Sequence, residues 1–353
     1  MKKWIILIFF IPCFAYSQPG KNTEQRLDSL FQTIFKSGEP GGAVLLVKNG
    51  TIIYKKGFGL ADMRTKNAIT SKTLFNVGSI TKTFVAYGIL RLAQDGKLSL
   101  DDDLYKYFPD FKNPDIARKI KLYHLLTHTS GLPDSRKVEE DSVFYLTAKD
   151  EENFAPIKQT EKLNFGPGEQ FQYSNPAFNG LALIIEKVTG KKWQNYIREI
   201  IFKPAGMKHS TITDGPYPEK GVSHGYLFDG KNFIEKDYGE EPTFAAAGNG
   251  GVWSSVEELW KYEQAIQQHI FLNADWINKS RTIFKFPNWK GAKSPFIGLS
   301  WFLSPGFTGH TGSQGGFRSD YAWWPEQNVF YVLLCNVPRP VTEIREKVLT
   351  ILK

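Results

Sequence analysis

Strand patterns lie at the two ends of the chain, and helical patterns lie between them. Residues 42–60 alternate apolar and polar side chains on both sides of Asn49-Gly50, a pair typical of two-residue hairpin turns. Near the other end, residues 317–324 and 328–337 are rich in β-branched and aromatic side chains and flank a Pro-Glu-Gln turn. We therefore expect a sheet whose strands come from both termini.

Helical periodicity fills the middle of the chain. Apolar residues recur at helical spacing in six segments, 81–94, 122–127, 175–189, 192–202, 255–269 and 341–352. We expect the first five to form a helical insertion and the last to pack back on the sheet. The acidic stretch 139–152 is expected to be a loop. The predicted fold class is α/β in the wide sense of a mixed fold. More narrowly it is α+β, because strands and helices are largely segregated along the chain.

The composition excludes several classes of protein. With 353 residues, of which 41% are hydrophobic and 23% charged, the chain is too apolar to be disordered and long enough to bury a core. Its 44 basic and 36 acidic side chains give a formal charge of +8, and the basic residues are scattered along the chain. We therefore expect a solvated surface and no nucleic-acid partner.

The N-terminus has the pattern of a secretory signal peptide over 1–17. A charged start precedes an apolar run at 4–11, and small residues occupy the −3 and −1 positions of a cleavage site after Ser17. Because the apolar run is too short to span a bilayer, we expect a mature chain of 18–353 without a stable membrane anchor, periplasmic or secreted. This mature chain keeps one cysteine, Cys335, which is expected to be a buried thiol.

Three short motifs carry chemistry, and the first of them is a serine followed by a lysine. Ser79 lies three residues before Lys82 at the predicted start of a helix, which places both side chains on one face with Cβ atoms roughly 5–6 Å apart. The amine can then contact the hydroxyl, and the helix N-terminus favours a developing negative charge. Alone, the pair is better explained as a helix-capping serine and a surface lysine, so its interpretation depends on the other motifs.

The second motif is a tyrosine two residues before an asparagine, Tyr173 and Asn175, at the start of another predicted helix. A phenol normally titrates near pH ~10, so Tyr173 can act as a base at neutral pH only beside a cation such as Lys82. Asn175 can bind a substrate carbonyl or cap the helix. The third motif, 309–316, is a glycine-dense strand edge that a ligand or another backbone can approach closely.

Together these motifs resemble those of the penicillin-recognising serine hydrolases: class C β-lactamases, low-molecular-weight penicillin-binding proteins, D-aminopeptidases and related esterases. The resemblance covers nearly the whole mature chain and includes the runs at 42–59, 125–133 and 248–255. It implies a five-stranded antiparallel sheet with terminal helices, formed by about 18–75 and 295–353, and a helical region over about 76–294. The active site is then expected in the cleft between the two parts.

The family pattern implies a role for each matching residue. Ser79 is the implied nucleophile of an acyl-enzyme, while Lys82 and Tyr173 take up its proton and return it to the leaving group. Tyr173 is also assigned as the base for the deacylating water. The backbone N–H groups of Ser79 and Ser313 are implied to bind the oxyanion. The residues implied to contact substrate are Asn175, His310, Thr311, Gly312 and Ser313.

The chain departs from the class C β-lactamases at His310, where those enzymes carry lysine. A histidine keeps a donor for a substrate carboxylate but is mostly neutral at pH 7, which weakens the charge that receives a penicillin. We therefore expect a peptidase or amidase acting on D-amino-acid or other short peptides, ahead of an esterase or a β-lactamase. A penicillin or peptidoglycan sensor without turnover, or an envelope scaffold, stays as an alternative.

Two further features have simpler interpretations. His124 and His128 have metal-ligand spacing on a helix, but no third ligand accompanies them, so we expect no metal and no other cofactor. Arg318 follows the third motif and could hold a substrate carboxylate, although an arginine on a strand more often faces solvent.

Overall fold

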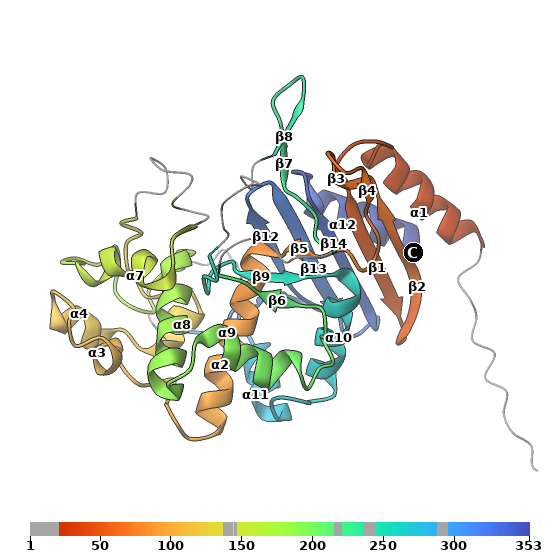
Figure 1. Cartoon of the computed structure of the whole chain (residues 1–353). Coiled ribbons are helices and arrows are strands. Elements are labelled where there is room, and N and C mark those ends of the chain that lie inside the picture. The colour runs from red at the N-terminus through yellow and green to blue at the C-terminus, as the bar shows by residue number, and fades with distance from the viewer. Residues whose placement is uncertain (1–20, 137–143, 145–146, 215–220, 236–244, 288–295) are drawn as a thin grey trace, which may run out of the picture.

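The computed structural model describes residues 21–136, 144, 147–214, 221–235, 245–287 and 296–353 (Figure 1). The expected signal peptide at 1–17 lies outside the described residues, and so does most of 139–146. Across the described part of the chain, no helix combines the length and the apolar character needed to cross a bilayer.

A seven-stranded antiparallel sheet forms the centre of the described structure, in the order β10-β11-β12-β13-β14-β1-β2. Its strands are β1 (Gly42–Lys48), β2 (Thr51–Phe58), β10 (Phe296–Ile297), β11 (Phe302–Ser304), β12 (Phe307–Gln314), β13 (Phe317–Trp324) and β14 (Val329–Cys335). The five expected strands are the five long ones, and β10 and β11 extend one edge of the sheet. These two are too short to show an alternating pattern in the sequence.

The two ends of the chain meet inside this sheet, because β1 pairs with β14 from Gly42 opposite Cys335 onward. The predicted hairpin between β1 and β2 is confirmed. Asn49 and Gly50 form its turn with φ values of 50° and 74°, as the mirror-image turns that fit twisted strands require. Cys335 is buried as predicted, and burial raises the pKa of its thiol to about 12, so the thiol stays protonated and unreactive at neutral pH.

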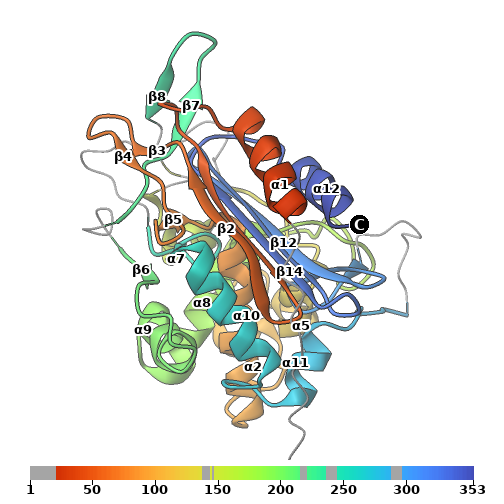
Figure 2. The ribbon, with the colours of Figure 1, turned by 90° about the vertical axis from the view of Figure 1, so that its right-hand side faces the viewer.

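Helices cover both faces of the sheet (Figures 1 and 2). On one face, α1 (Lys21–Ile34) and α12 (Val341–Leu352) lie side by side and pack on alternate residues of β1 such as Leu46. The residues between them, such as Leu45, point into the larger core on the other face. Because successive side chains alternate across a strand, an unbroken apolar strand such as β1 is buried on both faces. The C-terminal helix therefore packs on the sheet as expected.

The other face is covered by the helical part of the chain. Its elements are α2 (Thr81–Gln94), α3 (Leu104–Tyr107), α4 (Pro114–Lys119), α5 (Leu122–Leu126), α7 (Asp150–Lys158), α8 (Asn175–Thr189), α9 (Trp193–Ile197), the π-helical turn η2 (Arg198–Phe202), α10 (Val256–Gln267) and α11 (Ala274–Ser280). The helices α2, α8 and α12 have the predicted boundaries. The segment 192–202, expected as one helix, divides into α9 and η2.

Further short strands lie outside the large sheet. They are β3 (Leu60–Asp62), β4 (Asn67–Ala68), β5 (Phe75–Asn76), β6 (Thr211–Ile212), β7 (Tyr226–Phe228), β8 (Phe233–Glu235) and β9 (Val252–Ser254). Among them β5, β9 and β6 form a small sheet of their own, in that order. The end of β5 in this small sheet lies shortly before the start of α2, with Val77 and the 3₁₀ turn η1 (Gly78–Ile80) between them.

The loop expected at 139–152 is wrong at its C-terminal end, because α7 begins at Asp150. The side chain of Glu152 accepts the N–H of Lys149 at 2.7 Å, which satisfies a backbone donor at the start of the helix. Carboxylates favour the N-terminus of a helix. The acidic residues that suggested a loop therefore help to start a helix.

An ion pair buried between the layers ties the helices to the sheet. Arg281, which follows α11, donates to both carboxylate oxygens of Glu263 on α10, at 2.9 and 2.7 Å. Tyr321 of β13 donates its hydroxyl to the same carboxylate. The Glu263 side chain is fully buried, so its charge depends on these partners.

We expect Arg281→Met to lower the free energy of unfolding by about 3–5 kcal/mol, because it leaves the buried Glu263 carboxylate without its cation. Lys191→Met is the matched control, since Lys191 pairs with Glu199 at 2.6 Å but the two side chains are 50% and 54% exposed. The control should change the same free energy by less than about 0.5 kcal/mol. Urea unfolding measures both values, and equal losses would contradict the role given to the buried pair.

Candidate active site

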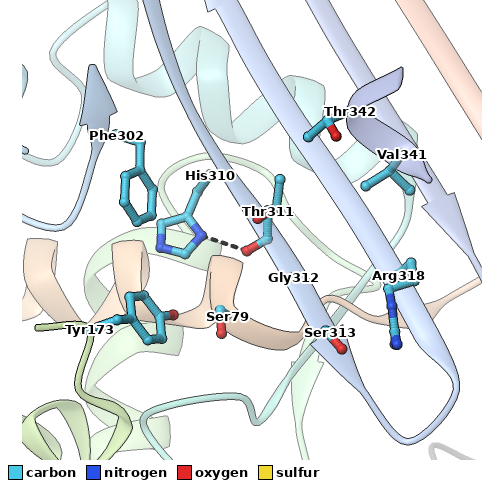
Figure 3. A pocket seen from close by; sticks show the side chains of 10 residues that line it. All are labelled: Ser79, Tyr173, Phe302, His310, Thr311, Gly312, Ser313, Arg318, Val341 and Thr342. Carbon is cyan, nitrogen blue, oxygen red and sulfur yellow. Dashed lines mark hydrogen bonds between the residues drawn. The ribbon is translucent and has the colours of Figure 1, made fainter. Parts of the chain in front are cut away.

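Ser79 lies on a single turn of 3₁₀ helix, η1 (Gly78–Ile80), which leads directly into α2. Asn76 holds this turn, because its Oδ1 accepts the N–H of Gly78 at 2.8 Å. The cap position of α2 falls on Ile80, so the alternative that Ser79 caps the helix is wrong. The Ser79 side chain instead lines a cavity (Figure 3).

Lys82 is buried next to Ser79, with 0% of its surface exposed. Its Nζ lies 2.9 Å from the Oγ of Ser79 and 2.7 Å from the carbonyl oxygen of Asn249. Burial, and after it the charge of Arg136, holds the pKa of this amine well below its ordinary value. The alternative of a surface lysine is therefore wrong, and the lowered pKa favours the uncharged form of the amine, which can accept the proton of the serine hydroxyl.

Buried Asp150 fixes the turn that carries Asn249. One oxygen of Asp150 accepts the N–H of Gly248 at 2.8 Å and the side-chain amide of Asn179 at 2.7 Å. The same Asn179 amide reaches the Oδ1 of Asn249 at 3.2 Å. Burial raises the pKa of Asp150 to about 8, so this carboxyl is largely protonated at neutral pH. The position of Lys82 thus depends on a network that extends to α7 and α8.

Tyr173 lies in the segment before α8, and 36% of its surface is exposed. Its ring stacks on His128, with centroids 4.3 Å apart, and on Phe302 of β11, with centroids 6.3 Å apart. The Nζ of Lys82 lies 5.1 Å from the centre of the Tyr173 ring. Figure 3 shows the phenol oxygen directed toward Ser79. The structure therefore brings the second motif to the first.

Asn175 is the first residue of α8 and does not line the cavity at Ser79. The cap of α8 is Ser174, whose hydroxyl accepts the N–H of Ala177 at 3.3 Å, so the capping role considered for Asn175 is wrong. Among the described residues, the Oδ1 of Asn175 is buried and has no hydrogen-bond partner. Its contact with substrate stays a prediction.

The third motif approaches the turn of Ser79 backbone to backbone. Gly78 has a φ of +53°, and a Cβ at this residue would lie 2.6 Å from the backbone nitrogen of Ser313. A Cβ at Gly312 would lie 2.1 Å from the carbonyl oxygen of Val77. Only glycine fits at either position. This contact brings the N–H of Ser313 beside the residue that precedes the nucleophile.

His310 on β12 is uncharged. It is 3% exposed, and its Nδ1 lies 2.6 Å from the carbonyl oxygen of Thr311, which assigns the ring proton to Nδ1. Burial, the largest cause, lowers the pKa of His310 to about 3. At neutral pH the residue therefore offers a lone pair at Nε2 and no positive charge.

These groups meet in one cavity of about 400 Å³. It is lined by Ser79, Tyr173, Phe302, His310, Thr311, Gly312, Ser313, Arg318, Val341 and Thr342 (Figure 3). Arg318 is half-buried and lines the cavity, and its contact with a substrate carboxylate stays a prediction. A hydroxyl beside an amine of lowered pKa, with backbone N–H groups close by, can carry out substitution at a carbonyl carbon.

Sequence reasoning missed three contributors to this site. Asn249 acts through its backbone carbonyl, which no side-chain motif reports, although it lies in the matching run 248–255. Phe302 comes from a strand too short to predict, and Asp150 from a helix that was expected as a loop. Of the three, only Asn249 had a signal in the sequence, because it lies in the run 248–255 that matches the family.

His128 was considered only as half of a metal-binding pair with His124. Within the described ranges, no three metal-binding side chains lie close enough together to hold an ion. His124 instead packs on Tyr123, with ring centroids 4.4 Å apart. His128 packs on Tyr173, and so contacts the candidate site.

Comparison with known proteins places the chain among relatives of the same architecture. The family model described as Beta-lactamase matches residues 24–352. The chain is 30% identical to a penicillin-binding protein of Bacillus subtilis (strain 168) over 268 residues, which are 72% of this chain and 58% of that protein. It is 30% identical to protein flp of Staphylococcus aureus (strain MW2) over 334 residues, or 90% of this chain and 64% of that protein. The chain thus spans less than two thirds of either relative.

A solved structure agrees with these matches. The octameric penicillin-binding protein homologue from Pyrococcus abyssi superposes with a TM-score of 0.78 at 27% sequence identity. The alignment covers 93% of this chain and 75% of that one. The fold described above, with its central antiparallel sheet and helical part, is therefore shared along almost the whole chain.

We expect Gly78→Ala to slow acylation of Ser79 roughly 100- to 1,000-fold, because the added Cβ pushes the N–H of Ser313 away from the nucleophile. Gly50→Ala is the matched control, since Gly50 also has a positive φ of +74° but no atom lies within 4 Å of its added Cβ. Both variants carry the strain of a left-handed alanine, about 1 kcal/mol, and only the first should lose reactivity. Stopped-flow labelling with an acylating ester measures the rate; a wild-type rate in Gly78→Ala would contradict this geometry.

Proposed function

The chain belongs to the β-lactamase family of serine hydrolases, and from this premise we propose that it hydrolyses short peptides or amides through an acyl-enzyme on Ser79. The observation that carries the proposal is the buried Nζ of Lys82, 2.9 Å from the Oγ of Ser79 and held below its ordinary pKa. A scaffold protein has no physical need for a buried lysine of lowered pKa beside a serine that lines a cavity.

The proposed reaction begins when the lone pair of Lys82 takes the hydroxyl proton of Ser79 as Oγ attacks the substrate carbonyl carbon. The C=O electron pair moves to oxygen, and the N–H groups of Ser79 and Ser313 stabilise the oxyanion. When the C=O bond re-forms, the C–N bond breaks. The leaving amine takes the proton of the Tyr173 hydroxyl, which Lys82 replaces, and an ester remains on Ser79.

Water completes the proposed cycle. Its oxygen attacks the ester carbonyl while its proton passes through Tyr173 to Lys82. The bond from the carbonyl carbon to Oγ then breaks, Lys82 returns the proton to Ser79, and the carboxylic acid leaves. The two half-reactions therefore use the same proton carriers in opposite directions, and each ends with Lys82 uncharged.

The uncharged state of His310 supports a peptide or amide substrate over a penicillin. With a pKa of about 3, this histidine cannot supply the fixed charge that lysine gives to a class C β-lactamase. Arg318 lines the same cavity and is the cation we propose for a substrate carboxylate. The pattern at 1–17 supports action outside the cytoplasm, and the resemblance to D-aminopeptidases supports D-amino-acid residues in the substrate.

The test compares the mature wild-type chain with Ser79→Ala by intact-mass analysis and product release. The probes are a D-alanyl-D-alanine peptide, a D-amino-acid amide, a short-chain p-nitrophenyl ester and a penicillin. We expect a transient adduct with turnover of the peptide or the amide, both lost in Ser79→Ala. Ser304→Ala, at an exposed position at the end of β11 and outside the cavity lining, is the control and should react as the wild type does.

Each other outcome selects a different function. Turnover of the ester or the penicillin alone would replace the peptide substrate by that class. A penicillin adduct that persists without release would identify a sensor. No adduct and no product with any probe, and no difference between the wild type and Ser79→Ala, would sink the catalytic proposal.

A second prediction concerns Arg318→Met. We expect KM to rise roughly 10- to 100-fold for a peptide with a free terminal carboxylate and to stay unchanged for the same peptide as its amide, because only the carboxylate loses its cation. Arg339→Met is the control. Arg339 donates Nη1 to the carbonyl of the preceding residue, as Arg318 does, but lies outside the cavity lining. Equal effects on both substrates would contradict the proposed carboxylate contact.

A further inference from the structure

His128 contacts three consecutive residues of the segment that carries Tyr173. Its backbone carbonyl accepts the N–H of Gln172 at 2.9 Å. Its ring stacks on the ring of Tyr173, with centroids 4.3 Å apart and planes 25° apart. Its Nδ1 accepts the N–H of Ser174 at 3.0 Å. His128 thus contacts the Tyr173 ring and the backbone of the residues on both sides of it.

The hydrogen bond to Ser174 fixes the chemical state of the imidazole ring. An Nδ1 that accepts a backbone N–H carries no proton, so the proton of the uncharged ring lies on Nε2. The ring is 0% exposed, and burial, the largest cause, holds its pKa well below the ordinary value. The ring of Phe178 packs on the same imidazole, with centroids 5.1 Å apart.

The backbone of His128 is strained, which supports a specific task for this residue. Its φ is +56°, a left-handed conformation that a non-glycine residue adopts only where the surroundings impose it. The surroundings do impose it here, because the N–H of His128 bonds back to Leu125 at 3.2 Å and the next residue, Thr129, bonds to His124 at 2.8 Å. The end of α5 thus turns sharply and directs the ring at Tyr173.

We propose that His128 is a positioning residue for Tyr173: it holds the phenol beside Ser79 and Lys82 in the orientation that proton transfer needs. Tyr173 is 36% exposed and lies outside any helix or strand, so the orientation of its ring depends on contacts such as the stack on His128, which at 4.3 Å between centroids is closer than the stack on Phe302 at 6.3 Å. His128 itself lies outside the cavity lining, so any effect on the reaction has to pass through the residues that it contacts, of which Tyr173 is the one that lines the cavity. The proposal rests on the proposed function of Tyr173 as the proton carrier.

Two substitutions separate the parts of this contact. His128→Asn keeps an acceptor at the position of Nδ1, tolerates the positive φ and removes the stacked ring. His128→Phe keeps the ring and removes the acceptor; because the Nε2 of His128 has no partner among the described residues, no other hydrogen bond is lost. We expect acylation of Ser79 by a short-chain p-nitrophenyl ester to slow roughly 10- to 100-fold in His128→Asn, with KM unchanged, and less in His128→Phe.

His124→Asn is the matched control. Its Nδ1 accepts the backbone N–H of Lys121 at 3.0 Å, the same kind of bond, and its ring packs on Tyr123 and not on Tyr173. Thermal unfolding should show a comparable loss of stability in His124→Asn and His128→Asn. Only His128→Asn should lose acylation rate, and a similar rate loss in both variants would reduce His128 to a structural residue.

A double-mutant cycle tests whether His128 acts through Tyr173. Tyr173→Phe keeps the stacked ring and removes the hydroxyl, so in this background His128→Asn should cause no further loss of rate. An undiminished loss in the Tyr173→Phe background would overturn the proposal, because it would show an effect that bypasses the phenol.

The position of the ring is measured independently of activity by ¹⁹F NMR on protein made with 3-fluorotyrosine. The Tyr173 resonance, assigned by its loss in Tyr173→Phe, should move toward the value of an exposed tyrosine in His128→Asn and stay in place in His124→Asn. An unchanged resonance in His128→Asn overturns the proposal. If no probe acylates the wild type, the proposed function has failed, and the resonance still decides whether His128 holds Tyr173.

Discussion

The burial of one amine governs the organisation of the candidate site. The hydrogen-bond neighbours of Lys82 are a hydroxyl and a carbonyl, not a carboxylate, so desolvation works against its charge without compensation from an acid. The surroundings follow from this constraint. Asp150, which holds the Asn249 turn, is itself largely protonated at neutral pH. His310 keeps its proton on Nδ1 and stays uncharged. The buried groups behind Ser79 are thus polar, and burial favours the uncharged form of each of them.

Local rules made much of the fold predictable. The hairpin at Asn49-Gly50 follows from a turn that needs two positive φ values. The boundaries of α8 follow from Pro176 in its first turn and from Gly190, which has a φ of +68° at its end. Ser79 and Lys82 were found in the same way, because a spacing of three residues at a helix start fixes their mutual position.

Tertiary contacts made the rest invisible in the sequence. The contribution of Asn249 is a carbonyl oxygen that every residue possesses. Gly78 matters because the backbone of β12 comes so close that a Cβ at residue 78 would overlap with it. No residue near Gly78 in the sequence indicates this contact. The spacing of His128 to His124 suggests only a metal-binding pair, whereas the stacking partner of His128, Tyr173, lies far along the chain. Interactions carried by backbone atoms, or by rings packed across distant segments, leave no periodic signal.

The pairing of β1 with β14 has a consequence for synthesis of the protein. Gly42 lies opposite Cys335 in the finished sheet, so the first long strand waits for its inner neighbour until almost the whole chain has been translated. At ~5–20 residues per second this interval lasts roughly 15–60 s. During this interval the edge of β1 that later pairs with β14 has no partner strand. Because β1 also carries apolar side chains such as Leu45 and Leu46, it then favours association with other chains. Such late closure makes folding slow and gives chaperones a defined segment to shield.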